Sequence, residues 1–326
     1  MVKDKKKELI GIALLVAATL IWGGSFFLLK TTIESLPTFF VLALRFSVGA
    51  VMVGLVFIKR LIKFKLKALW QGSVIGLFLA AAYTLQTLGL KGTTPGKNAF
   101  LTASYVVIVP FIVWILFKNR PKWNNIVAAV LCVAGVGLVS LTGSFHVEQG
   151  DILSLLCGIF YAGQFITISR FTKESDGGQL LFTELLTVAV IFWIVSFASE
   201  KMPTSIGTDM IFPLVYLAVL ATGAGQLFQL FGQKHVSVNS VSIIMSLEAV
   251  FGALFSVIFY GERPSAQVLA GFAVMFVAVL ISELDWKEIG DKIKAKKEAK
   301  EEKGEEEPPS ENTDILYKDR DEQKQD

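Results

Sequence analysis

Histidine, cysteine and charged residues are all scarce in this sequence. It has two histidines and two cysteines in 326 residues, and no Walker loop, HExxH, GxSxG or CxxC motif occurs in it. These are the residues and motifs on which most metal sites and nucleophilic active sites depend. Their absence argues against catalysis, so we predict a protein that is not an enzyme and that has no metal and no cofactor.

The shortage of charge excludes a soluble globular domain. Charged residues make up 18% of the chain and hydrophobic residues 53%, whereas a soluble domain is roughly a quarter charged. The charges are also segregated, because nearly all of them lie in the first eight residues, in short breaks between apolar runs, or after Trp286. This pattern predicts an all-α integral membrane protein that contacts the lipid bilayer and no nucleic acid.

Ten apolar runs have about the 20 residues that a helix needs to cross the hydrocarbon core. The first run is long, lacks a clear cleavage site and is followed by nine others, so it is interpreted as a retained helix and not as a signal peptide. The ten predicted transmembrane helices cover residues 9–29, 38–58, 70–90, 97–117, 123–142, 151–170, 179–199, 211–231, 237–259 and 265–283.

Lysine and arginine predict the orientation of these helices. If the N-terminus is inside, fifteen lysine and arginine residues fall in cytoplasmic segments before the tail and five fall on the opposite side. This bias predicts a multi-pass protein of the cell (inner) membrane with both termini in the cytoplasm. Residues 1–8 form a basic cytoplasmic N-terminus. Residues 285–326 mix lysine and glutamate with few apolar residues, and we predict a disordered cytoplasmic tail. His146 and His235 then lie on opposite sides of the membrane.

The chain contains an internal repeat. A shift of 143 residues aligns "KNRPKWNN" from Lys118 with "GERPSAQV" from Gly261, and a shift of 139 aligns "LIWGGSFF" from Leu20 with "IFYAGQFI" from Ile159. The repeats correspond to residues 9–146 and 147–284. Each holds five spans, and because five is odd, the second repeat is inverted relative to the first. Ten helices in two inverted five-helix repeats are typical of secondary transporters.

These features resemble a known family. The ten spans, the "LIWGGSFF" start and the "LEAVFGALFSVIFYGERP" of the ninth span are similar to the EamA-type branch of the drug/metabolite transporter superfamily, over residues 9–284. The resemblance implies alternating-access export or exchange of a small organic metabolite, an amino acid or a drug-like solute, without ATP hydrolysis. A channel or a non-transporting receptor is the alternative. A homodimer remains an option that the sequence does not decide.

Three ionisable residues lie inside predicted spans, where charge is costly. Glu248 is near the membrane midplane, Arg45 is nearer the outer end of its span, and Glu184 is nearer the cytoplasmic end. Arg45 could pair with either glutamate only to satisfy charge. Alternatively, Glu248 borders the transport route and changes protonation, as a proton-coupling residue, while Arg45 attracts an anionic group of the substrate. For Glu184 alone, the preferred interpretation is a charge that snorkels to the cytoplasm.

Amide and aromatic side chains at helical spacing extend this candidate site. Four pairs of residues each share a helix face: Trp22 with Ser25, their repeat counterparts Tyr161 with Gln164, Tyr83 with Gln86, and Gln226 with Gln229. The alternative for each residue is an interhelical hydrogen bond or an aromatic position at the membrane interface. Tyr105 aligns with Glu248 in the repeat. The predicted substrate-binding residues are Trp22, Ser25, Arg45, Tyr83, Gln86, Tyr105, Tyr161, Gln164, Gln226, Gln229 and Glu248.

Glycine and proline inside the spans suggest where helices bend. Gly24 and its counterpart Gly163 are expected to interrupt their spans, and Pro110 removes a backbone donor and favours a kink. We predict gating roles for these three residues. Gly72 and Gly76, four residues apart, instead predict close packing between helices.

Overall fold

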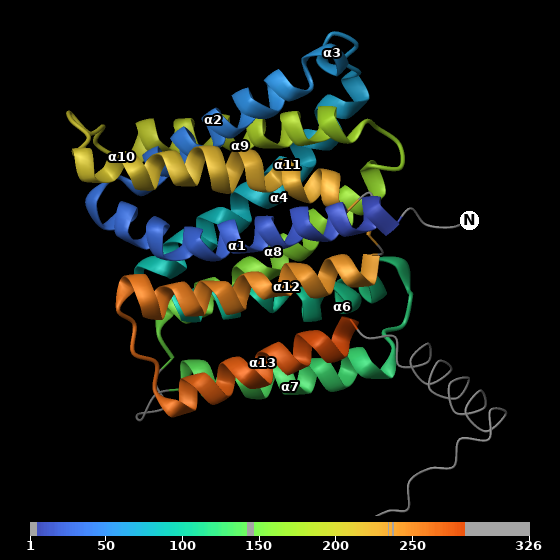
Figure 1. Ribbon diagram of the computed structural model, residues 1–326, viewed down its shortest axis with the longest axis vertical. Helices are drawn as coiled ribbons and strands as arrows, with labels where there is room; N and C mark the ends of the chain where they lie inside the picture. Colours follow the sequence, from blue (N-terminus) through green and yellow to red (C-terminus); the bar gives the residue numbers. More distant parts are fainter. Residues whose placement is uncertain (1–4, 142–146, 234, 237, 284–326) are drawn as a thin grey trace, which may run out of the picture. The chain divides into compact units, whose positions relative to one another are not determined.

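Every secondary-structure element of the described chain is a helix. The computed structural model describes residues 5–141, 147–233, 235–236 and 238–283 (Figure 1). Eight helices in these ranges are long and apolar enough to cross a membrane, and two shorter apolar helices cover Ile244–Tyr260 and Ala266–Ser282. The structure therefore agrees with an all-α membrane protein. The predicted tail and His146 lie outside the described residues.

The elements follow the predicted spans closely, with one short extra helix, α3, between the second and third spans. In chain order they are α1 (Lys5–Ser35), α2 (Thr38–Val56), α3 (Ile58–Leu61), α4 (Leu66–Lys91), α5 (Pro95–Ala103), α6 (Tyr105–Phe117), α7 (Trp123–Ser140), α8 (Gln149–Phe171), α9 (Gly177–Ser199), α10 (Thr208–Val215), the π-helix η1 (Tyr216–Ala224), α11 (Gly225–Gly232), α12 (Val238–Phe255), the π-helix η2 (Ser256–Tyr260) and α13 (Ala266–Glu283).

The predicted interruptions at Gly24 and Gly163 are wrong, whereas the kink at Pro110 stays a prediction. Helix α1 continues through Gly24 and α8 continues through Gly163, so neither glycine interrupts its span. The span that contains Pro110 is divided at Ser104, six residues before the proline, and α6 runs through the proline. The eighth span is divided into α10, η1 and α11, because its middle adopts the wider π-helical turn.

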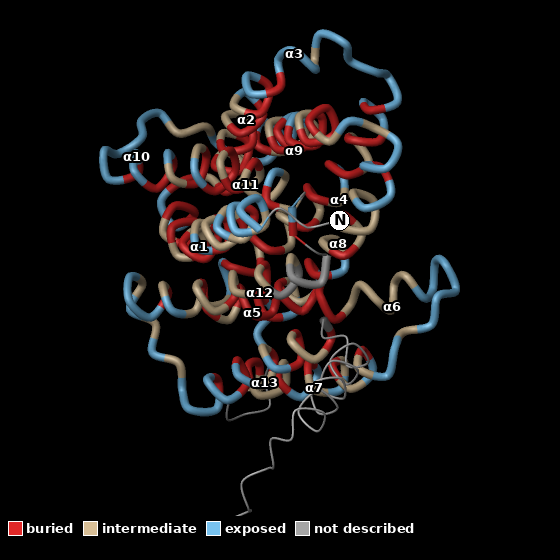
Figure 2. Tube along the Cα trace, turned by 45° about the vertical axis from the view of Figure 1, so that its right-hand side comes forward, coloured by how far each residue is buried: buried red, intermediate tan, exposed pale blue. Residues whose placement is uncertain are grey.

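Large apolar side chains cover the outward faces of the helices. Val133 of α7 is 73% exposed and Phe197 of α9 is 68% exposed, although both lie within spans. Buried residues concentrate on the faces where helices meet (Figure 2). In water so large an apolar surface would aggregate, whereas the acyl chains of a bilayer are as apolar as these side chains. The burial pattern thus supports membrane embedding independently of hydropathy.

Packing between helices comes in pairs that the repeat relates. Helix α4 packs against α8, and the corresponding α11 packs against α1. Helix α4 also packs against α9, and its counterpart η1 packs against α2. In the same way, α12 packs against α1, and its counterparts α5 and α6 pack against α8. Helices α2 and α9, which are counterparts, contact each other, and so do α7 and α13. Each half therefore completes the environment of the other.

The turns after α6 and η2 share an unusual backbone conformation. Lys118 and Gly261, which are 143 residues apart, both adopt the left-handed conformation, with φ of 62° and 75°. Glu262 follows Gly261 and accepts hydrogen bonds from Thr94 Oγ1 and Ser256 Oγ, and from the backbone N–H of Gly96 at 3.0 Å. Its carboxylate thus satisfies a donor at the N-terminus of α5, where the helix dipole favours negative charge. Asn119, the counterpart of Glu262, is exposed.

Close approach of α4 to α9 depends on two glycines. A Cβ atom at Gly76 would lie 2.8 Å from Cβ of Thr187 and 2.9 Å from the carbonyl oxygen of Glu184, and a Cβ at Gly72 would lie 2.5 Å from Cβ of Thr183. Such distances are shorter than side chains tolerate. The structure therefore supports the prediction that this glycine pair permits tight helix packing.

Gly76→Val should lower the melting temperature of the purified protein, because the new methyl groups force α4 and α9 apart at a cost of about 1–3 kcal/mol. Gly137→Val is the matched control, since a Cβ there has only Leu141 Cδ1 within 4 Å, at 3.9 Å. Thermal unfolding in detergent, followed by tryptophan fluorescence, measures the difference. Equal melting temperatures for the two variants would contradict the close crossing.

Candidate functional site

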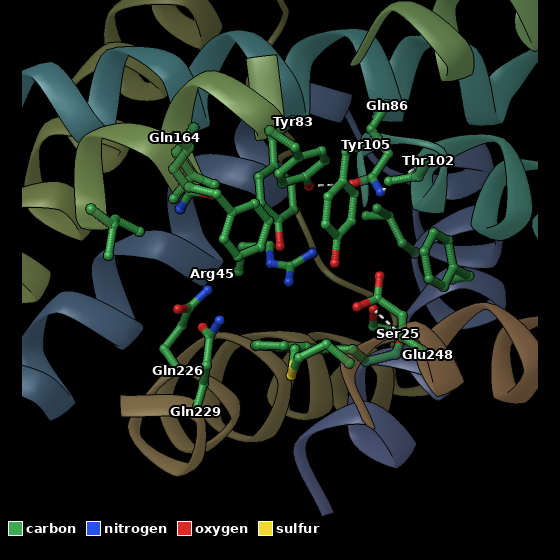
Figure 3. Close-up of a pocket in the computed structure, with 18 residues that line it drawn as sticks. Ser25, Arg45, Tyr83, Gln86, Thr102, Tyr105, Gln164, Gln226, Gln229 and Glu248 are labelled. Carbon is green, nitrogen blue, oxygen red and sulfur yellow. Dashed lines mark hydrogen bonds between the residues drawn. The ribbon is translucent and has the colours of Figure 1, made fainter. Parts of the chain in front are cut away.

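A polar cavity lies in the middle of the helix bundle, and all eleven predicted substrate-binding residues line it (Figure 3). The cavity has a volume of about 60 Å³. That the eleven residues line one cavity does not establish that they bind substrate, and their binding role stays a prediction. The other lining residues are Phe26, Leu29, Leu79, Thr102, Phe165, Ile168 and Met245.

Arg45 places a buried positive charge at this cavity. Its side chain is 1% exposed, and its Nε donates a hydrogen bond of 2.8 Å to Thr222 Oγ1. The guanidinium carbon lies 5.1 Å from the ring centroid of Tyr83 and 5.5 Å from that of Phe46, within the range of cation–π attraction. Its Nη2 is buried with no hydrogen-bond partner among the described residues. A guanidinium held on one edge and unsatisfied on the other can bind a carboxylate.

The π-helix η1 positions the partner of Arg45. Thr222 Oγ1 donates a 2.8 Å hydrogen bond to the carbonyl of Leu217, five residues earlier, which leaves its oxygen free to accept from Arg45. The preceding carbonyl, of Ala221, accepts a 2.7 Å bond from Trp22 Nε1. Gly49 permits this approach, since a Cβ there would lie 2.6 Å from Thr222 Cγ2. Helices α1 and α2 are therefore both fixed to the wide turn of η1.

Glu248 projects from α12 into the same cavity as Arg45 (Figure 3). It is half-buried, and it makes no hydrogen bond or ion pair with any residue that the structure describes. Arg45 likewise pairs with neither Glu248 nor Glu184 within that part of the chain, which contradicts the interpretation of Arg45 as one half of an ion pair. The cavity therefore holds two opposite charges that do not satisfy each other.

Tyrosines and amides form the wall between these charges. Tyr161 donates a 2.9 Å hydrogen bond to Gln86 Oε1, and Gln86 Nε2 donates to Thr102 Oγ1 at 3.2 Å. Tyr105 stacks on Phe165 with ring centroids 4.9 Å apart. These contacts fix the orientation of one wall. The opposite end of the cavity, where Gln164, Gln226 and Gln229 gather away from Glu248, is richer in amides (Figure 3).

Two of the predicted gating residues, Gly24 and Gly163, lie at helix contacts. A Cβ at Gly24 would lie 2.5 Å from the hydroxyl oxygen of Tyr216, and a Cβ at Gly163 would lie 2.6 Å from the ring of Phe78. Both glycines thus permit close packing beside the cavity. Pro110 lies on α6, beyond the break at Ser104. A gating role for the three residues stays a prediction.

Glu184 does not snorkel to the cytoplasm as predicted. It is 3% exposed, and its Oε1 accepts a 2.5 Å hydrogen bond from Gln164 Nε2. It lines a second cavity that adjoins the first. Thr222 and Thr102 are further polar residues of the site that the sequence did not single out, because a threonine inside a span ordinarily bonds only to its own helix.

The family-model comparison decides the family. The EamA-like transporter family matches residues 9–141 and again residues 148–284. The chain belongs to this family. The family supports a membrane transporter as the function class. Among the described residues no three His, Cys, Asp or Glu side chains are placed to hold a metal.

Relatives of this EamA-like protein cover most of its length. An uncharacterized transporter of Archaeoglobus fulgidus is 29% identical over 84% of this chain and 85% of that protein. The biotin transporter of Escherichia coli is 23% identical over 84% of this chain and 93% of that protein. One solved crystal structure has a TM-score of 0.64 at 17% identity, covering 86% of this chain and 98% of that one, and it shows the fold alone.

Thr222→Val should lower the melting temperature, because it removes the acceptor of a buried charged donor at a cost of about 1–3 kcal/mol while keeping the side-chain shape. Thr222→Ser should restore it. Thr84→Val is the control, since the Thr84 hydroxyl bonds only to the carbonyl of Ala80 in its own helix. If Thr222→Val and Thr84→Val unfold at the same temperature, Thr222 does not hold Arg45.

Proposed function

We propose that this protein is a secondary carrier that moves a small organic metabolite bearing a carboxylate, by alternating access and in the direction of export. Its ten transmembrane helices form two inverted five-helix repeats in the cell (inner) membrane, with both termini in the cytoplasm. The observation that carries the proposal is the buried Arg45, whose Nη2 lies unsatisfied beside a central polar cavity. The direction of transport rests on the family resemblance alone.

The energetics of Arg45 favour an anionic solute. A buried donor left unsatisfied, as Nη2 is here, costs about 1–3 kcal/mol and more when its group is charged, and a hydrogen bond to a charged group contributes about 1.5–3 kcal/mol. A carboxylate that reached Nη2 would remove this penalty. The rings of Tyr83 and Trp22 and the surrounding amides suit a solute that is otherwise apolar or hydrogen-bonding. Biotin, which the Escherichia coli relative transports by name, has such a carboxylate and belongs in the first set of solutes to test.

Two observations support alternating access between inverted repeats. The family model matches the chain twice in succession, and the helix contacts of one half recur in the other. When such halves exchange conformations, the central site opens to each side in turn. A channel or a receptor without transport activity remains the alternative, but neither requires a duplicated bundle with a site between its halves.

Solute counterflow in proteoliposomes tests the carrier and the role of Arg45 together. Biotin, monocarboxylates, neutral amino acids, nucleosides and cationic amines form the panel, and we expect exchange of a carboxylate-bearing member. Arg45→Lys should weaken the protein's apparent affinity for that solute by at least about tenfold, because lysine keeps the charge but loses the planar guanidinium and its stacking on the rings.

Arg60→Lys is the matched control for this substitution. Arg60 forms a 2.8 Å ion pair with Asp176 at an exposed position, where lysine can serve as well, so this variant should exchange solute as the wild type does. Unchanged affinity in Arg45→Lys would remove Arg45 from the binding site. Voltage-dependent unitary currents in place of counterflow would identify a channel.

We propose in addition that Glu248 couples transport to protons. It is a carboxylate that faces the cavity without a partner among the described residues, and the groups opposite it are Arg45 of α2, Tyr83 of α4, Tyr105 of α6 and Tyr161 of α8. Arrival of a solute carboxylate at Arg45 alters the charge of this enclosed space, which changes the free energy of protonating Glu248.

The Glu248→Gln protein should exchange solute when the pH is the same on both sides of the membrane, but it should no longer accumulate solute in response to an imposed pH gradient. The exposed Glu174→Gln serves as the control and should keep the response. Uptake into proteoliposomes with acidic and neutral lumens provides the measurement. A Glu248→Gln protein that still follows the pH gradient would exclude Glu248 as the coupling residue.

A further inference from the structure

A second cavity continues from the central one toward the ends of α8, α9 and α11. The two cavities share Phe165, Ile168, Gln226 and Gln229. At its far end the second cavity reaches Thr172, Gly177 and Gln233, which follow or begin those helices. The second cavity has a volume of about 50 Å³. In the proposed orientation this end is cytoplasmic.

Glu184 is the charged residue of the second cavity, and it is bonded only at one oxygen. Oε1 accepts from Gln164, and no cation among the described residues lies within ion-pair distance of the carboxylate. Arg45, on the neighbouring helix α2, is directed to Thr222 and to the rings of Phe46 and Tyr83. The bundle therefore buries a carboxylate beside a space and leaves its charge uncompensated.

Two cations at the cytoplasmic rim, Arg60 and Lys67, are already engaged. Arg60 pairs with Asp176 at 2.8 Å and Lys67 pairs with Glu174 at 2.9 Å. The hydrogen bond from Lys67, together with one from Gln71, lowers the pKa of Glu174 from its usual value, so the Glu174 carboxylate remains ionised at neutral pH. Neither Arg60 nor Lys67 is thus available to Glu184, and no other described cation lies within ion-pair distance of it. A cationic ligand in the cavity would compensate its charge.

The remaining lining selects the kind of cation. Gln226, Gln229 and Gln233 lie at i, i+3 and i+7 on one face of α11 and its C-terminal turn, and none has a side-chain hydrogen bond to a described residue. Opposite them are apolar side chains, among them Ile75, Leu180 and Leu181. A metal ion requires several oxygen ligands around it. An alkyl chain with a terminal ammonium group instead fits this lining, because the carboxylate and the row of glutamines can bind the ammonium group and the apolar side chains can contact the alkyl chain.

We propose that the second cavity is an ammonium subsite, in which Glu184 binds the amino group of a solute on the cytoplasmic side of the Arg45 site. A solute with both an amino and a carboxylate group would engage Glu184 first and Arg45 afterwards, with Gln226 and Gln229 common to both positions. The order of binding rests on the proposed carrier function, but binding of an ammonium group at Glu184 does not.

Protection of a cysteine in this cavity tests the subsite directly. In Gln233→Cys protein, we expect n-butylammonium chloride to slow maleimide labelling of the new cysteine several-fold, while n-butanol and an equal concentration of sodium chloride have no effect. The native Cys132 and Cys157 are buried, so they interfere little. Adding Glu184→Gln should abolish the protection, because the amide keeps the shape but not the charge. Adding Glu248→Gln should leave it intact.

The other outcomes overturn the proposal. Equal protection by sodium chloride would indicate an inorganic cation site, and equal protection by n-butanol would indicate apolar contact alone. Protection that survives Glu184→Gln, or that disappears with Glu248→Gln, would place the amino group elsewhere. If Glu184→Gln does not fold, the wild type decides: butylammonium must raise its melting temperature above the values in n-butanol and in sodium chloride, and no rise refutes the subsite.

This experiment is independent of the carrier proposal. Butylammonium has no carboxylate and requires no transport, so loss of counterflow in the Arg45 variants would leave its result unchanged. Conversely, a protein that exchanges carboxylates but shows no ammonium protection would keep the carrier and lose the subsite.

Discussion

A guanidinium buried in the middle of a membrane bundle is the constraint around which this structure is organised. Transfer of an arginine from water into such an interior is costly unless its donors are satisfied. Here Thr222 accepts from Nε and two aromatic rings lie beside the charge, yet Nη2 has no partner in the described chain. The bundle therefore tolerates Arg45 without fully compensating it.

Local irregularities in neighbouring helices follow from this arrangement. An ordinary α-helical turn would direct the Thr222 hydroxyl toward a carbonyl four residues earlier, whereas the π-helix lets it reach Leu217, five residues earlier. Gly49 on α2 and Gly225 at the start of α11 supply the close approaches, since Cβ atoms there would collide with Thr222 and Trp22. Substitutions at these glycines would thus affect the site without any contact with the solute.

Much of this architecture could be predicted from the sequence, because hydropathy and repeat spacing depend on short-range periodicity. The spans were located to within a few residues, and helical spacing grouped Tyr83 with Gln86 and Gln226 with Gln229 around what proves to be one cavity. The π-helices and the break at Ser104 could not be found in this way, since a helical wheel assumes one turn geometry throughout. Glu184 was misplaced for another reason: depth along a span does not reveal whether a side chain faces lipid, water or another helix.

The two left-handed turns, at Lys118 and Gly261, differ in the contacts of the residue that follows each of them. Glu262 is bonded to Thr94, Gly96 and Ser256, while Asn119 at the corresponding place in the first half is exposed. The conformation described here is therefore stabilised at one end of the bundle by contacts that its other end lacks. Replacing Glu262 would therefore destabilise this conformation by removing these contacts, whereas replacing the exposed Asn119 would leave them intact.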